Sequence, residues 1–281
     1  MTLVRVLGIA LVAAMLASCR DEARVAPTPT AYAWPDSFAF KMEFVSETSA
    51  QGAVVMRYEE RKELLFAVRD ERYLAWHDSV VKETQDPRRG PVAEPYQPED
   101  TVHYYVTLDR WGRIARSEPG CDPAVAACQQ VLPSALPLEL LRLVPRLPVW
   151  APPKGAVWVD TLVFDDTPRP RGGRGAIVTS YRVSGDTVVA QVPLWRVLWH
   201  SFRRTYGVVA PGLRGITADV PVEEEGIVYI DKERQLPVFA TWAGAVAAPP
   251  ALASLGVTGT GFRGRAYLVG SIVERLLAPP Q

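Results

Sequence analysis

Hydrophobic and polar residues alternate along most of the chain. In residues 37–46, SFAFKMEFVS, the side chains of Phe38, Phe40, Met42 and Phe44 share one face of an extended strand. This period of two is typical of a strand with one buried face. The pattern returns in residues 53–60, 63–70, 101–109, 156–164, 176–183, 226–231 and 265–273. We therefore predict a mainly β fold, an antiparallel meander shaped as a half-barrel or a sandwich, with short helical inserts.

Residues 132–153 interrupt the alternation. Leu136, Leu140 and Leu143 have helical spacing, but prolines such as Pro137 and Pro145 limit the helix to one or two turns. We expect a Leu/Pro-rich helical connector here, between a β-rich half at residues 37–131 and another at residues 154–281. The pattern is equally compatible with two domains and with one continuous sheet.

Two segments repeat one arrangement. Residues 102–117 and 226–241 each place an aromatic-rich strand before an aspartate, then a short polar turn and a second extended run. Asp109 and Asp231 open these turns, so we expect each carboxylate to accept hydrogen bonds from the backbone of its turn.

The first 19 residues have a different pattern. Arg5 precedes an apolar run at residues 6–16, which is too short to span a bilayer, and the run ends in Leu16-Ala17-Ser18-Cys19. This ending resembles the lipobox of bacterial lipoprotein precursors. The resemblance implies that residues 1–18 are a cleaved signal peptide and that acylated Cys19 anchors the chain to a membrane. An ordinary secretory signal with a chance cysteine is the alternative.

The residues after the lipobox indicate how the domain is attached and to which membrane. Residues 19–36 contain three prolines and no apolar periodicity, as expected for the lipidated cysteine and a flexible tether. The resemblance places the domain in the periplasm, within the cell envelope. Arg20 stands where enterobacterial lipoproteins retained at the inner membrane have Asp, which favours the outer membrane over the inner one.

The balance of charge bears on the class of partner, and the cysteines bear on cross-linking. The chain has 31 basic and 31 acidic residues, which argues against a general nucleic-acid binder. Cys121 and Cys128 are expected to form a structural disulfide in an oxidising compartment. A redox or metal pair is the alternative, but the usual spacing is C-x-x-C and no second Cys/His pair accompanies them.

The sequence offers no catalytic motif, P-loop or paired metal ligands, so we predict neither a cofactor nor a metal site. The three histidines, His77, His103 and His200, are far apart in the chain. We interpret residues 223–225, three consecutive glutamates, as a solvated edge or loop. The arginines and glycines of residues 165–175 suit a solvated hairpin loop better than a phosphate or lipid-headgroup cradle.

Eight tryptophans favour a well-filled core, with an apolar concavity or a membrane-facing rim as the rival interpretation. An exported lipoprotein with a long meander and Leu/Pro-rich inserts is similar to the LolA/LolB and LppX-type lipid carriers, which are half-barrels under a helical lid. The resemblance implies that residues 136–144 form the lid and contribute Leu140. It places the rest of the ligand pocket at Phe40, Met42, Phe44, Tyr104 and Trp158.

These observations lead to three hypotheses. The first is a membrane-anchored, non-enzymatic envelope protein that binds an apolar or lipid ligand. The second is a structural or envelope-assembly lipoprotein that acts through a protein interface. The third is an envelope hydrolase with dispersed catalytic residues, for which the sequence gives no positive sign.

Overall fold

The computed structural model describes residues 31–86, 90–95, 98–122, 128–150, 152–166, 173–209, 217–248, 253–254 and 256–277. Its strands are β1 (Ser37–Ala50), β2 (Ala53–Arg69), β3 (Arg72–Asp86), β4 (Gly90–Ala93), β5 (Tyr104–Leu108), β6 (Ile114–Pro119), β7 (Val157–Asp165), β8 (Arg174–Val189), β9 (Val192–Val209), β10 (Thr217–Asp231), β11 (Leu236–Ala247) and β12 (Val257–Leu268). The helical segments are α2 (Pro98–Thr101), the 3-10 turn η1 (Cys128–Gln130), α3 (Ala135–Leu143) and α5 (Ile272–Leu277).

The twelve strands form one antiparallel sheet in the order β6-β5-β3-β2-β1-β12-β11-β10-β9-β8-β7, with β4 added beside β3. This confirms the predicted mainly β meander with short helical inserts. The strands of residues 37–131 and of residues 154–281 belong to the same sheet, because β1 pairs with β12 from Phe40 opposite Leu268 onward.

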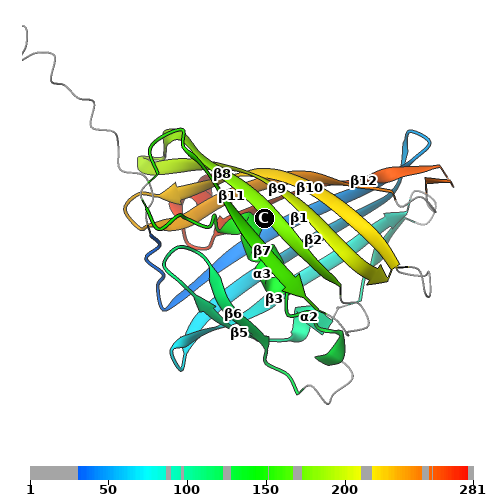
Figure 1. Ribbon diagram of the computed structural model, residues 1–281, viewed down its shortest axis with the longest axis horizontal. Helices are drawn as coiled ribbons and strands as arrows, with labels where there is room; N and C mark the ends of the chain where they lie inside the picture. Colours follow the sequence, from blue (N-terminus) through cyan, green and yellow to red (C-terminus); the bar gives the residue numbers. More distant parts are fainter. Residues whose placement is uncertain are drawn as a thin grey trace, which may run out of the picture.

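The sheet bends until its two wings face each other, as expected for a twisted sheet of this width. Figure 1 shows β1, β2 and β3 running behind β8, β9 and β10, with α3 between the wings. We call the surface that faces α3 the inner face and the opposite surface the outer face. Inner-face residues of both wings form one hydrophobic core with Leu136, Leu140 and Leu143 of α3.

Two hydrogen-bonded links fix the ends of α3. Before the helix, the backbone N–H and the hydroxyl of Ser134 donate to the carboxylate of Asp166, just after β7. After it, Trp158 Nε1 of β7 donates to the carbonyl of Arg146 at 2.7 Å, and Arg146 pairs with Asp160 at 2.7 Å. The short helix is therefore tied to edge strand β7.

The predicted Asp turns are confirmed. Asp109 Oδ1 accepts hydrogen bonds of 2.8 Å from the backbone N–H groups of Trp111 and Arg113. Asp231 Oδ1 accepts from the N–H groups of Glu233 and Arg234 at 2.8 and 3.0 Å. The same local chemistry therefore closes both turns.

Candidate ligand-binding site

The predicted ligand residues lie on or against the inner face. Five belong to the hydrophobic core: Phe40, Met42, Tyr104, Leu140 and Trp158. Phe44 is half-buried at the margin of this core. Of the strand residues, only Met42 and Phe44 also line a cavity beside α3. The remaining strand residues fill the core, and Trp158 additionally holds the segment after α3.

The cavity lies between the inner face and one side of α3, with a volume of about 210 Å³. Its walls combine apolar groups with charged ones. The lining residues are Met42, Phe44, Glu60, Lys62, His77, Ala135, Leu138, Glu139, Arg142, Arg203 and Trp242. The volume of the cavity is many times the roughly 10–15 Å³ of such volume that one water needs, so the space can hold a polar headgroup and a few carbons.

Glu139 connects α3 to the wing formed by β2 and β3. Its carboxylate lies 2.9 Å from Lys62 Nζ of β2 and 2.8 Å from His77 Nε2 of β3. Burial would raise the pKa of Glu139, but the charges of Lys62 and His77 and their hydrogen bonds hold the pKa of this carboxyl well below its usual range. Lys62 also contacts Glu60 at 3.0 Å, so its ammonium is shared between two carboxylates.

Arg142 connects the same helix to the opposite wing. Its guanidinium donates from Nε and Nη2 to the two carboxylate oxygens of Glu224 on β10, both at 2.8 Å. Such bidentate pairs are the strongest class of ionic hydrogen bond. The pKa of Glu224 is lowered because the bonds and charge of Arg142 outweigh the effect of burial. One turn of α3 thus bridges both wings by ion pairs.

Arg203 of β9 is a second guanidinium beside this pair. Burial and the neighbouring charge of Arg142 lower the pKa of Arg203, although Glu224 partly opposes them. Within the part of the chain that the structure describes, the buried Nε of Arg203 has no hydrogen-bond partner. The two arginines therefore face one carboxylate, and that carboxylate is already bonded to Arg142.

Aromatic rings lie flat against this part of the inner face because glycines stand on the neighbouring strands. A Cβ at Gly264 would come within 2.2 Å of the Trp242 ring, and a Cβ at Gly226 within 2.7 Å of the Trp199 ring. Both indoles are buried, and both Nε1 groups lack a hydrogen-bond partner among the described residues. The glycines thus create a flat aromatic surface beside the arginines.

The charged cluster is the part of the site that the sequence analysis missed. Glu224 belongs to the glutamate run that we interpreted as a solvated edge, and that interpretation is wrong. β10 lies inside the sheet, so alternation turns Glu224 to the buried inner face while Glu223 and Glu225 point outward. Glu60 and Lys62 could have been recognised in the same way. Both are charged residues at positions of β2 that alternation turns to the inner face.

The remaining predictions concern the cysteines, metal ligands and membrane-spanning segments. A disulfide joins Cys121 and Cys128, with 5.8 Å between their Cα atoms, as predicted. Cys19 and the lipobox lie outside the described residues. Among the residues described, no group of three metal-ligating side chains comes together, and no helix combines the length and apolar character needed to cross a bilayer.

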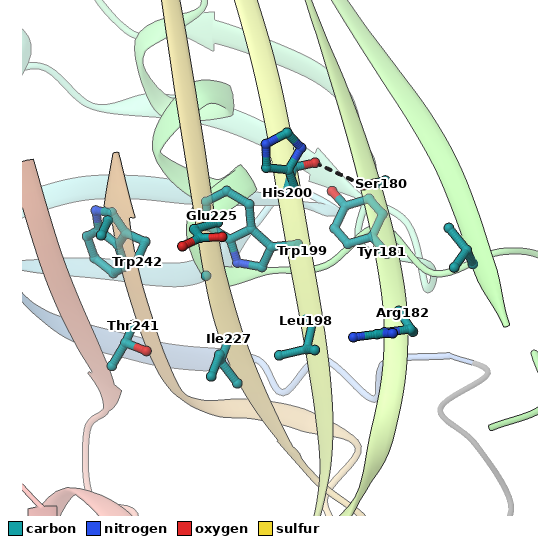
Figure 2. A pocket seen from close by; sticks show the side chains of 13 residues that line it. Ser180, Tyr181, Arg182, Leu198, Trp199, His200, Glu225, Ile227, Thr241 and Trp242 are labelled. Carbon is teal, nitrogen blue, oxygen red and sulfur yellow. Dashed lines mark hydrogen bonds between the residues drawn. The ribbon is translucent and has the colours of Figure 1, made fainter. Parts of the chain in front are cut away.

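A second depression lies on the outer face, over β8 to β11, with a volume of about 620 Å³. Figure 2 shows Arg182, Leu198, Ile227 and Thr241 in one row across these strands. His200 lies at its margin and contacts Glu223 at 2.8 Å, with both side chains largely exposed. Its lining also includes Tyr181, Trp199 and Trp242, which are buried in the sheet beneath this row.

No protein-family model matches the chain, and no curated protein matches it. Among solved structures, one similar chain is that of "Lipid-protein interactions in lipovitellin", with a TM-score of 0.48 and 10% identity. The match covers 84% of this chain but only 25% of the lipovitellin chain. Another is the hypothetical lipoprotein YmcC from Escherichia coli (K12), with a TM-score of 0.26, 9% identity and coverage of 91% and 95% of the two chains.

Proposed function

We propose that this protein is a lipid-anchored component of the bacterial envelope that binds an apolar or lipid ligand on the inner face of its bent sheet. The cavity beside α3 carries the proposal. It joins five apolar residues to six charged or titratable ones, a lining more polar than that of most small-molecule sites, which suits the polar end of an amphiphilic ligand.

The cavity holds only the polar end of a lipid while α3 is in place. We propose that the rest of the ligand lies along the inner face beyond α3, between β1, β2 and β12. Phe44 and Phe262 are half-buried there, with ring centroids 5.8 Å apart, and Met56 farther along β2 is 45% exposed. This strip provides partly exposed apolar surface at the margin of the core.

Native mass spectrometry of the full-length protein after mild extraction tests ligand binding. We expect a bound lipid that is released on denaturation. The variant Ala135→Phe places a ring in the cavity and should remove the lipid without loss of folding, whereas Val163→Phe, on an outer-face residue that is 74% exposed, should retain it. A folded wild-type protein without bound ligand would contradict the proposal.

The anchor is tested separately. We expect Cys19→Ser to abolish membrane retention and to leave the signal uncut or differently cut, while the fold is unchanged. Fractionation and mass analysis of the N-terminus measure both effects. Separation of the two membranes then tests the proposed outer-membrane location. A Cys19→Ser protein that is still processed and membrane-bound would overturn the lipid anchor.

An interface for an envelope protein is the second candidate function, and one surface favours it. Val157, Val159 and Val163 form a row on the outer face of edge strand β7, and they are 61%, 61% and 74% exposed. Val178 and Phe202 extend this row onto β8 and β9. Exposed apolar patches of this kind are typical of protein interfaces. Site-specific photocrosslinking from position 163 in the intact envelope should then give one discrete adduct, absent when the crosslinker replaces Arg61 on β2.

A further inference from the structure

The inner cavity contains more hydrogen-bond donors than acceptors on its Arg203 side. Arg203 Nε and the Nε1 groups of Trp199 and Trp242 are buried and have no partner among the described residues. A small hollow between α3 and β8 to β10, lined by Arg142, Arg203 and Trp199, adjoins the main cavity, which is lined by Arg142, Arg203 and Trp242. The buried donors of Arg203 and Trp199 thus line the same small hollow, whereas the edge of the Trp242 ring that carries Nε1 lies against Gly264 of β12.

The charges that line the cavity are also distributed unevenly between its two sides. On the β2 side of the cavity, Lys62 lies between two carboxylates, Glu60 and Glu139. On the β9 side, Arg142 and Arg203 share the single carboxylate of Glu224, whose two oxygens both bond to Arg142. Leaving His77 aside, the three carboxylates of the two hollows offset their three cationic side chains, but on the β9 side two guanidinium groups face one carboxylate.

Burying a charge or a polar donor without a partner costs free energy, so such groups rarely persist in a core unless something uses them. Carboxylates and phosphates accept several hydrogen bonds at once and pair with guanidinium groups in a planar geometry. Neutral alcohols or glycosyl groups would offer Arg203 a hydrogen bond but no ion pair. The chemistry of the donors therefore selects an acid.

We propose that Arg203, together with the indole N–H group of Trp199, binds the acidic headgroup, carboxylate or phosphate, of an amphiphilic ligand. This assignment rests on the proposed function, because it places the apolar tail along the strip between Phe44 and Met56. It makes Arg203 the residue that selects acidic amphiphiles over neutral ones of the same chain length.

Binding of matched short amphiphiles to the full-length protein in amphipol tests the assignment. The probes are decanoate, decyl phosphate, decanol and inorganic phosphate, with affinity measured by calorimetry. We expect the two acidic amphiphiles to bind at least ~10-fold more tightly than decanol, because hydrogen bonds to charged groups are stronger than neutral ones. Arg203→Met should remove this preference and leave decanol binding unchanged.

Arg204→Met is the matched control. Arg204 is the next residue of β9 and is exposed on the outer face, so the variant removes the same charge without touching the cavity. It should retain the acid preference. In the absence of ligand, Arg203→Met should raise the melting temperature, because it removes a guanidinium whose buried Nε has no hydrogen-bond partner among the described residues and whose charge raises the cost of burying Arg142.

The outcomes separate the two proposals. Equal binding of decanol and decanoate leaves lipid binding intact and overturns the role of Arg203. Inorganic phosphate that binds as tightly as decyl phosphate identifies a free-anion site and overturns the amphiphile. Absence of binding by every probe overturns both proposals. A lower melting temperature for Arg203→Met, with the acid preference retained, assigns the guanidinium a structural role and also overturns the inference.

Discussion

Replacing Glu139 by Gln removes one charge from the bridge between α3 and the β2–β3 wing and keeps the size of the side chain. The carboxylate is buried and lies 2.9 Å from Lys62 Nζ and 2.8 Å from His77 Nε2. Breaking a buried ion pair by removing one partner costs about 3–5 kcal/mol. Because Lys62 keeps Glu60 at 3.0 Å and the amide still forms hydrogen bonds, we expect a smaller loss, about 2–3 kcal/mol.

For a chain of this size, that loss corresponds to a melting temperature lower by about 5–10 °C. Thermal and denaturant unfolding of the full-length protein at pH 7 measures it. Glu118→Gln is the control, because this carboxylate on β6 is exposed, and surface ion pairs contribute about 0–1 kcal/mol. An unchanged melting temperature for Glu139→Gln would show that apolar contacts alone hold α3.

The stability difference between wild type and Glu139→Gln should depend on pH. The pKa of Glu139 in the folded state lies below its unfolded value of about 4.3. Such a group stabilises the fold above the unfolded pKa, and this contribution is lost as the pH falls through the folded pKa. The stability difference between wild type and Glu139→Gln should therefore shrink below about pH 4. A difference independent of pH would refute the assigned ion pair.

Three further changes test the packing of the inner face. Gly264→Ala should cost about 1–3 kcal/mol and quench or shift the Trp242 fluorescence, because the new Cβ would lie 2.2 Å from the ring; an unchanged Trp242 signal would contradict the close approach. Leu140→Ala should lower the free energy of unfolding by about 2–5 kcal/mol, measured by urea denaturation, since this side chain is only 3% exposed. Replacing Cys121 and Cys128 by Ser should cost at most about 2.5 kcal/mol, because the bridge closes a loop of seven residues' separation; a loss twice as large would indicate a wider structural role.

Local chemistry was predictable from the sequence, and long-range pairing was not. Period-two alternation identified parts of most strands, although it did not single out β3 or β9 and its last run, residues 265–273, continues past the end of β12 at Leu268. The Asp109 and Asp231 turns followed from the side chain alone. Nothing local predicts that β1 pairs with β12, because Phe40 and Leu268 are brought together only by the whole meander. Two separate halves and one sheet give the same alternation in each strand.

The candidate site shows the same limit. Glu60 and Lys62 stand at inward positions of β2, which is a local sign of a buried polar site. Their partner Glu139 comes from a helix far along the chain, and a helix of this length presents apolar and charged residues in several directions. Alternation therefore identifies which strand positions need partners but does not identify the partners.

The pairing of β1 with β12 also has a consequence for how the sheet is completed. These strands lie side by side in the middle of the sheet, although one is the first and the other the last of the strands that the structure describes. When a chain emerges with its N-terminus first, during synthesis or export, one edge of β1 stays unpaired until β12 has also emerged. Such long-range closure is slow, and an open strand edge is prone to aggregation. We therefore expect folding to depend on protection of the free edge of β1 while the chain emerges. Pairing of β1 with β12, which follows the β11–β12 hairpin, would be the closing step.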